Sequence, residues 1–138
     1  GIPVYLSRDW HPKHHPSFAE EGGLWPAHCL QDTPGAAFHP GLHKPPEVVI
    51  ITKGTRFDQD QNSAFDQTGL AVHLRKAGIR RLIVGGLAED VCVLATVLDA
   101  LAEGFAVSVI AAGTRPVTPE GGAAARLKML TEGAELLL

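Results

Sequence analysis

One carboxylate and several imidazoles stand close together near the start of the chain. Asp9, His11 and the adjacent pair His14 and His15 fall within seven residues, and prolines stiffen this segment. Histidine nitrogen combined with a carboxylate oxygen is a donor set that suits Zn, Fe or Mn. His28 is the natural closing ligand, and we expect only one of His14 and His15 to point inward. The alternative is a polar, histidine-rich loop whose side chains are solvated.

Cys92 is the second candidate for chemistry. It lies in the first turn of a predicted helix that directly follows a predicted strand. A helix N-terminus favours anions and lowers a thiol pKa, and its N–H groups can hold an oxyanion. Lys53, at the end of a neighbouring strand, is placed to pair with the thiolate. The alternative is an inert buried thiol, the usual state of a free cysteine.

The elements that must position these residues follow from apolar periodicity. Strands are expected at residues 3–7, 47–52, 81–86, 106–111 and 135–138, and helices at 67–77, 90–103 and 119–130. This alternation predicts an α/β fold, a three-layer α/β/α sandwich with a mainly parallel sheet. Sites in such sheets lie beyond the carboxyl ends of strands, so the segments from Asp9, from Lys53 and from Leu87 are expected at one edge.

Residues 8–46 show almost no apolar periodicity. This stretch holds seven of the ten prolines and six of the seven histidines. Irregular segments this long in a compact domain are usually functional or disordered, and the histidine density favours function.

Composition excludes several classes of protein. With 12 Lys and Arg against 15 Asp and Glu, a net charge of −3 offers no basic excess for nucleic acid. No apolar run approaches the roughly 20 residues that cross a bilayer, and residues 1–9 do not resemble a signal peptide. Two cysteines do not make a disulfide framework, which favours a cytoplasmic location.

Taken together, these segments resemble the nicotinamidase branch of the isochorismatase-like cysteine hydrolases. They occur in the family's order and at similar spacing across the whole chain. The matching stretches are Ser7-Arg8-Asp9-Trp10-His11-Pro12, His15-Pro16-Ser17-Phe18-Ala19, Trp25-Pro26-Ala27-His28-Cys29, Thr52-Lys53-Gly54 and Gly86-Leu87-Ala88-Glu89-Asp90-Val91-Cys92-Val93.

The resemblance implies a role for each matching residue. The metal ligands would be Asp9, His11, His15 and His28, with His15 preferred over His14 because it directly precedes the Pro-Ser-Phe-Ala stretch. Cys92 would be the nucleophile and Lys53 a member of its triad. A cis peptide at Leu87–Ala88 would aim the N–H groups of Ala88 and Cys92 at the oxyanion. Trp25 would stack on the substrate ring, and Leu87 and Val91 would line the pocket.

The implied reaction is hydrolysis of nicotinamide, and of pyrazinamide as a related substrate, through a thioester. The implied cofactor is one divalent metal ion, zinc first and iron or manganese as alternatives. Homo-oligomers occur in the family.

Two departures leave alternatives open. No residue here matches the family's aspartate in an Asp-x-Gln motif on a first strand, so we expect residues 1–138 to be one domain that lacks its first strand and helix. Val91 stands where an aromatic residue or histidine is more usual. The alternatives are a related hydrolase of another small amide or isochorismate, an inactive metal-binding paralogue, and, more remotely, a flavodoxin-like binding module.

Overall fold

The computed structural model describes residues 1–138, which divide into two compact units. The first unit is Gly1–Gln61 and the second is Asn62–Leu138. The expectation of one domain stays a prediction. No helix in the structure combines the length and apolar character needed to cross a bilayer.

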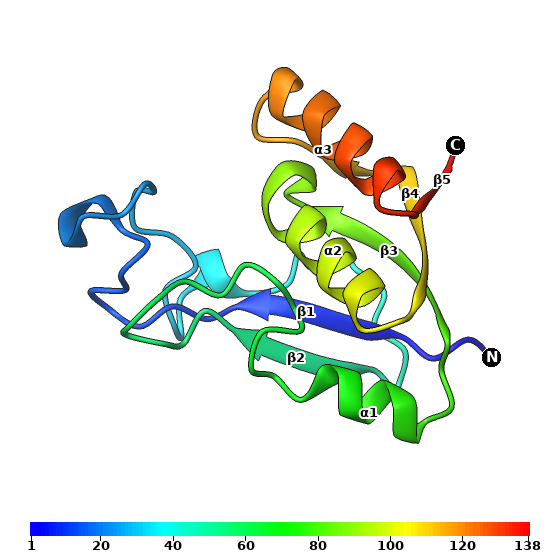
Figure 1. Ribbon diagram of the computed structural model, residues 1–138. Helices are drawn as coiled ribbons and strands as arrows, with labels where there is room; N and C mark the ends of the chain where they lie inside the picture. The colour runs from blue at the N-terminus through cyan, green and yellow to red at the C-terminus, as the bar shows by residue number, and fades with distance from the viewer. The chain divides into compact units, whose positions relative to one another are not determined.

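The first unit is built on two parallel strands. Strand β1 is Tyr5–Asp9 and β2 is Val49–Lys53, and the β-branched run in β2 explains its extended backbone. The two strands run side by side in Figure 1. Their register places Asp9 opposite Lys53. Because parallel strands end at the same edge, this pairing brings two of the three expected chemical segments together.

The long stretch between these strands is irregular, as predicted. It contains only short 3₁₀ turns, Ala19–Glu21 and Pro34–Ala36, and two isolated bridges. One bridge joins His11 to Leu30, so the loop returns to the end of β1. The bridge therefore brings the segment around Leu30 next to the segment around His11.

The second unit contains a three-stranded parallel sheet in the order β3-β4-β5. Its strands are Arg81–Leu87, Ala106–Arg115 and Glu135–Leu137. Apolar side chains from the middle strand and two helices form its core, including Val97, Val107, Val109 and Met129. The sequence predicted all three strands, but β4 extends past residue 111 through Ala112-Gly113-Thr114, which lacks the β-branched pattern of its first half.

The helices of this unit are α1, Leu70–Lys76, α2, Leu94–Ala102, and α3, Pro119–Thr131, and they are labelled in Figure 1. Helix α1 begins later than predicted because Gly69 has φ 77°, a left-handed conformation that a right-handed helix does not contain. Helix α3 begins where the Thr118 side chain accepts the N–H of Gly121. The helix predicted at 90–103 instead starts with one π-helical turn, Glu89–Val93, which precedes α2.

Candidate metal centre and cysteine turn

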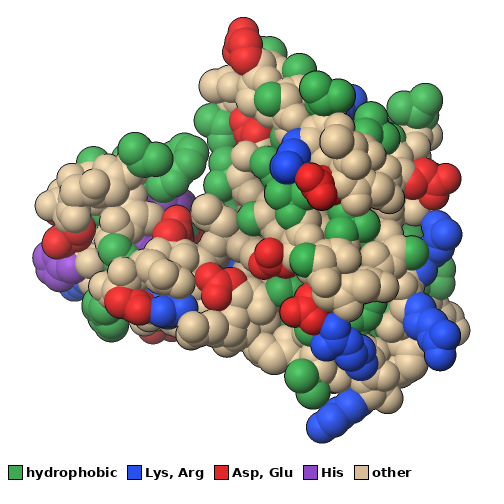
Figure 2. Space-filling view, viewed as in Figure 1, with side chains coloured by type: hydrophobic (Ala, Val, Ile, Leu, Met, Phe, Trp, Pro, Cys, Tyr) green, Lys and Arg blue, Asp and Glu red, His purple; other side chains and the backbone are tan.

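Three of the predicted ligands converge at the end of β1. Asp9, His11 and His28 each offer a ligand atom, and these atoms lie within 4.8 Å of one another. The chain brings His28 here because the N–H of His11 donates to the carbonyl of Cys29 at 2.8 Å. In the space-filling view of Figure 2, the histidines visible on this face gather in the part formed by the long loop, beside acidic side chains.

Backbone carbonyls fix the tautomers of two of these histidines. His11 Nδ1 lies 2.9 Å from the carbonyl of His28, and His28 Nδ1 lies 2.8 Å from the carbonyl of Pro26. A carbonyl oxygen only accepts hydrogen bonds, so Nδ1 must carry the proton in both rings. The lone pair is therefore on Nε2, the arrangement in which a histidine binds a metal and is oriented by an outer hydrogen bond.

Of the adjacent pair, His15 is the one that points inward. His15 is fully buried, and its ring centroid lies 4.2 Å from that of His11. The His14 side chain is 75% exposed and pairs with Glu21. Nε2 of His15 is buried and has no hydrogen-bond partner. A buried donor or acceptor without a partner is costly in a protein that binds nothing at this position.

Lys53 lies beneath this cluster rather than in solvent. Its ammonium donates to Asp9 Oδ1 at 2.5 Å and to the carbonyl of Gln61 at 3.2 Å, and the residue is 3% exposed. The Gln61 side chain also accepts the N–H groups of Gly54 and Thr55. The loop after β2 is thereby tied to the carboxylate at the end of β1. Pairing of Lys53 with the Cys92 thiolate stays a prediction.

The lack of a side chain at Gly54 leaves room for the His11 ring. A Cβ at Gly54 would lie 2.7 Å from both Cδ2 and Nε2 of His11, and Gly54 has φ 73°. We expect Gly54→Ala to displace the ligand nitrogen and weaken divalent-metal affinity by about tenfold or more. The measurement is a competition titration of metal-stripped protein against a chromophoric chelator.

Gly69→Ala is the matched control for this substitution. Gly69 has the same left-handed backbone, φ 77°, but an added Cβ would meet nothing within 4 Å. Both variants carry similar backbone strain, on the order of 1 kcal/mol. Only Gly54→Ala should lose metal affinity, and equal affinity in the two variants would contradict this role of Gly54.

Cys92 lies in the second unit, in the π-helical turn Glu89–Val93 at the carboxyl end of β3. The N–H of Val93 donates to the carbonyl of Ala88 at 3.0 Å, the wide bond that defines the turn. The Leu87–Ala88 peptide is cis, as the family resemblance implies. The structure therefore agrees with the predicted strand–turn–helix but replaces its first α-helical turn with a π-turn, a geometry often found at functional sites.

Two acidic residues hold this turn in place. Glu89 is 1% exposed and its carboxylate accepts from Arg126 of α3 at 2.8 Å. Asp90 Oδ1 accepts the N–H of Val117 at 2.8 Å, and its other oxygen accepts the N–H of Thr118 at 3.4 Å. The hydrogen bond from Val117 is the main cause that lowers the pKa of Asp90. The start of α3 thus anchors the cysteine turn.

Asp90→Asn should lower the free energy of unfolding by about 1 kcal/mol at neutral pH, the low end for a charged hydrogen bond because this carboxylate is only half-buried. The folded pKa lies below the ordinary value of 3.8. The stabilisation is therefore present above about pH 3.8 and is lost as pH falls through the folded pKa. Urea unfolding of both proteins across this range measures the difference.

Asp99→Asn is the control for this prediction, because the Asp99 carboxylate on α2 accepts no hydrogen bond in the structure. The Asp99→Asn substitution should change the free energy of unfolding little at any pH. A difference between wild type and Asp90→Asn that does not shrink at low pH would show that the ionised carboxylate is not what anchors the turn.

The three residues expected to line a substrate pocket have different surroundings. Trp25 is half-buried, with its ring edge-on to His28 at a centroid distance of 6.4 Å. Val91 is half-buried within the cysteine turn, and Leu87 is 73% exposed. The structure places Trp25 beside the metal cluster, and the stacking role stays a prediction.

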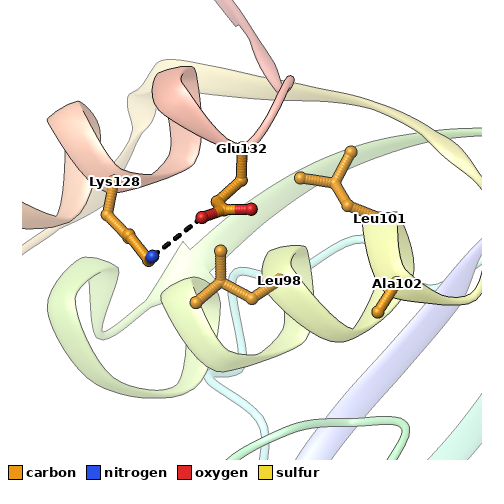
Figure 3. Close-up of a pocket in the computed structure, with 5 residues that line it drawn as sticks. All are labelled: Leu98, Leu101, Ala102, Lys128 and Glu132. Atoms are coloured by element: carbon orange, nitrogen blue, oxygen red, sulfur yellow. Dashed lines mark hydrogen bonds and ion pairs between the residues drawn. The ribbon is translucent and has the colours of Figure 1, made fainter.

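A separate hollow lies between α2 and α3. It has a volume of about 380 Å³ and is lined by Leu98, Leu101 and Ala102 of α2 and by Lys128 and Glu132, which Figure 3 shows. Lys128 and Glu132 form an ion pair at 2.8 Å. None of the predicted site residues lines this hollow, so the chemistry is assigned to the metal cluster and the cysteine turn.

Comparison with known proteins decides the family. The isochorismatase domain model matches residues 1–138. The chain belongs to the isochorismatase family. The nicotinamidase of Escherichia coli K12 is 40% identical over 159 residues, covering 99% of this chain and 75% of the relative.

Two solved structures of the family are also similar. The pyrazinamidase of Pyrococcus horikoshii in complex with zinc has a TM-score of 0.94 and 41% identity, covering 99% of this chain and 75% of that one. PnC1 from L. infantum in complex with nicotinate has a TM-score of 0.94 and 38% identity, covering 98% and 71%. The isochorismatase-like α/β fold with parallel sheets is thus confirmed.

Sequence reasoning missed Asp60 and Gln61, which follow β2. Asp60 joins His11 and His15 in a second group whose ligand atoms lie within 4.8 Å of one another. The segment Asp58-Gln59-Asp60 offers two carboxylates, and nothing in its pattern indicates which one turns inward. Only the position of this segment in the chain could have indicated a role, since it follows Lys53 at the carboxyl end of a parallel strand, where sites in such sheets lie.

Proposed function

We propose that the protein is a metal-dependent nicotinamidase that converts nicotinamide to nicotinate and ammonia. The observation that carries the proposal is the cluster of one carboxylate and buried imidazoles, with His15 Nε2 left without a partner. The similarity to the nicotinamidase of Escherichia coli and to structures with bound zinc and bound nicotinate supports it.

The residues present fit a divalent ion. His11 and His28 present Nε2 lone pairs, His15 adds a buried nitrogen, and Gly54 leaves open the space that a Cβ would fill. We assign Asp9, His11, His15 and His28 as ligands and zinc as the ion, with iron or manganese as alternatives. When bound, the ion supplies a Lewis acid that holds the pyridine nitrogen and withdraws electron density from the ring.

The covalent steps belong to the cysteine turn. The Cys92 thiolate attacks the carboxamide carbon and forms a carbon–sulfur bond, while the carbonyl oxygen takes the negative charge. The N–H groups of Ala88 and Cys92 are assigned to hold that oxyanion. The amide nitrogen then takes up a proton, the carbon–nitrogen bond breaks, and the nitrogen leaves as ammonia while the thioester forms. Water hydrolyses the thioester, which yields nicotinate and restores the thiol. The family's aspartate has no counterpart in residues 1–138, so we assign no general base within them.

The test compares nicotinamide with benzamide, which has the same carboxamide on a ring without nitrogen. Ammonia release by the full-length, metal-loaded protein should be fast with nicotinamide, much slower with benzamide, and lost after chelation. Equal rates with the two amides would argue for a metal-independent amidase of the family. No ammonia from either amide would indicate an inactive metal-binding paralogue.

A further inference from the structure

We propose that Asp60 is an additional ligand of the metal ion, joining His11 and His15. The inference rests on the proposed metal site and adds to it a residue from the loop after β2. Asp60, His11 and His15 form a compact group whose ligand atoms lie within 4.8 Å of one another. Ligands about 2.1 Å from one ion cannot be more than about 4.2 Å apart, so this spacing is close to that of a formed site.

The buried nitrogen of His15 is the independent observation that points to a cation here. Nδ1 of His15 has its partner in the Ser17 hydroxyl at 2.7 Å, whereas Nε2 has none. This buried nitrogen without a partner and the carboxylate of Asp60 beside it are two donors of the kind that bind a divalent metal ion.

The two donor groups must share one ion. His11 belongs to both groups, but its Nδ1 proton is donated to the carbonyl of His28. Only Nε2 then carries a lone pair, and one lone pair serves one metal. Asp60 therefore adds to the same coordination sphere and does not form a second site.

Charge balance favours a second carboxylate. The charge of Asp9 is offset by Lys53, which donates to its Oδ1 at 2.5 Å. Imidazole ligands bring no negative charge to a bound divalent cation, so the carboxylate of Asp60 would add the negative charge that Asp9 shares with Lys53. One oxygen of Asp60 accepts the N–H of Gln61 at 2.9 Å, which orients the carboxylate and leaves its other oxygen for the ion.

The experiment titrates the metal-stripped, full-length protein with Zn²⁺ against a chromophoric chelator. Asp60→Asn should weaken Zn²⁺ binding by more than about 100-fold, at a stoichiometry of one ion in every variant, because a direct ligand contributes more than an outer-shell partner. Asp58→Asn is the matched control, because it removes the same charge from the same loop at an exposed carboxylate that pairs with Arg56. It should bind Zn²⁺ like wild type. Circular dichroism of the metal-free proteins shows whether each variant is folded.

Co²⁺ absorption separates a ligand from a nearby charge, since the visible bands of Co²⁺ respond to the number and type of its ligands. Asp60→Asn and His15→Gln should each change the spectrum, and Asp58→Asn should not. Unchanged affinity, or weaker affinity with an unchanged spectrum, would overturn the assignment, as would two bound ions. Neither readout uses nicotinamide, so a protein that releases no ammonia but shows these changes would refute the proposed function and leave Asp60 as a ligand.

Discussion

Cys92→Ala is expected to reduce ammonia release from nicotinamide by more than about 10⁴-fold, because it removes the atom that forms the thioester. Divalent-metal affinity should remain at the wild-type value, since Cys92 is not one of the assigned ligands. Activity is measured as ammonia and affinity by chelator competition. A drop in both would indicate that the substitution perturbs the structure and does not act on catalysis alone.

Cys29→Ala is the matched control, because it makes the same change at the only other cysteine. Cys29 lies in the loop after His28 and has φ 48°. Unlike Cys92, it neither follows a strand nor begins a helix. The variant should stay folded and active. If Cys29→Ala abolishes turnover and Cys92→Ala does not, the nucleophile has been assigned to the wrong residue.

His11→Ala is expected to lower metal affinity by more than about 100-fold and to abolish turnover at ordinary metal concentrations. His11 is 2% exposed and is the one imidazole that belongs to both donor groups. Loss of a ligand costs more than the 10- to 100-fold typical of outer-shell partners. Excess metal should restore part of the activity, because the Cys92 turn is intact.

His28→Ala keeps this prediction testable if His11→Ala fails to fold. His28 is only half-buried, so its removal leaves a smaller cavity. His14→Ala is the control, because its exposed ring pairs with Glu21 outside the cluster. Metal affinity that survives the loss of both His11 and His28 would rule out the assigned site.

The sequence predicted the parts of the fold that depend on local pattern. All five strands and the three helices lie where apolar periodicity placed them, with shifts at their ends. The shifts have local causes, such as the left-handed Gly69 before α1. The π-turn around Cys92 could not be predicted, because its wide hydrogen bond depends on the backbone at Ala88 and not on a side-chain pattern.

The order of the motifs in the sequence predicted which segments form the candidate site. It did not predict the site residues whose role depends on the direction in which a side chain points. The segment after β1 was expected to bind metal, and the structure brings Asp9, His11 and His28 together. The position of Asp60 beside His11 and His15 depends on how the polar loop after β2 folds back, which no residue pattern in that loop encodes. The pairing of Lys53 with Asp9 likewise follows from strand register, which is a property of the sheet.

The central claim is that this chain hydrolyses nicotinamide with Cys92 and a bound metal. The most direct test is to incubate the full-length, metal-loaded protein with nicotinamide and to quantify ammonia and nicotinate together. We expect equal amounts of both products from the wild type, and neither product from Cys92→Ala or from the chelated protein. A folded, metal-loaded protein that leaves nicotinamide unchanged would contradict it.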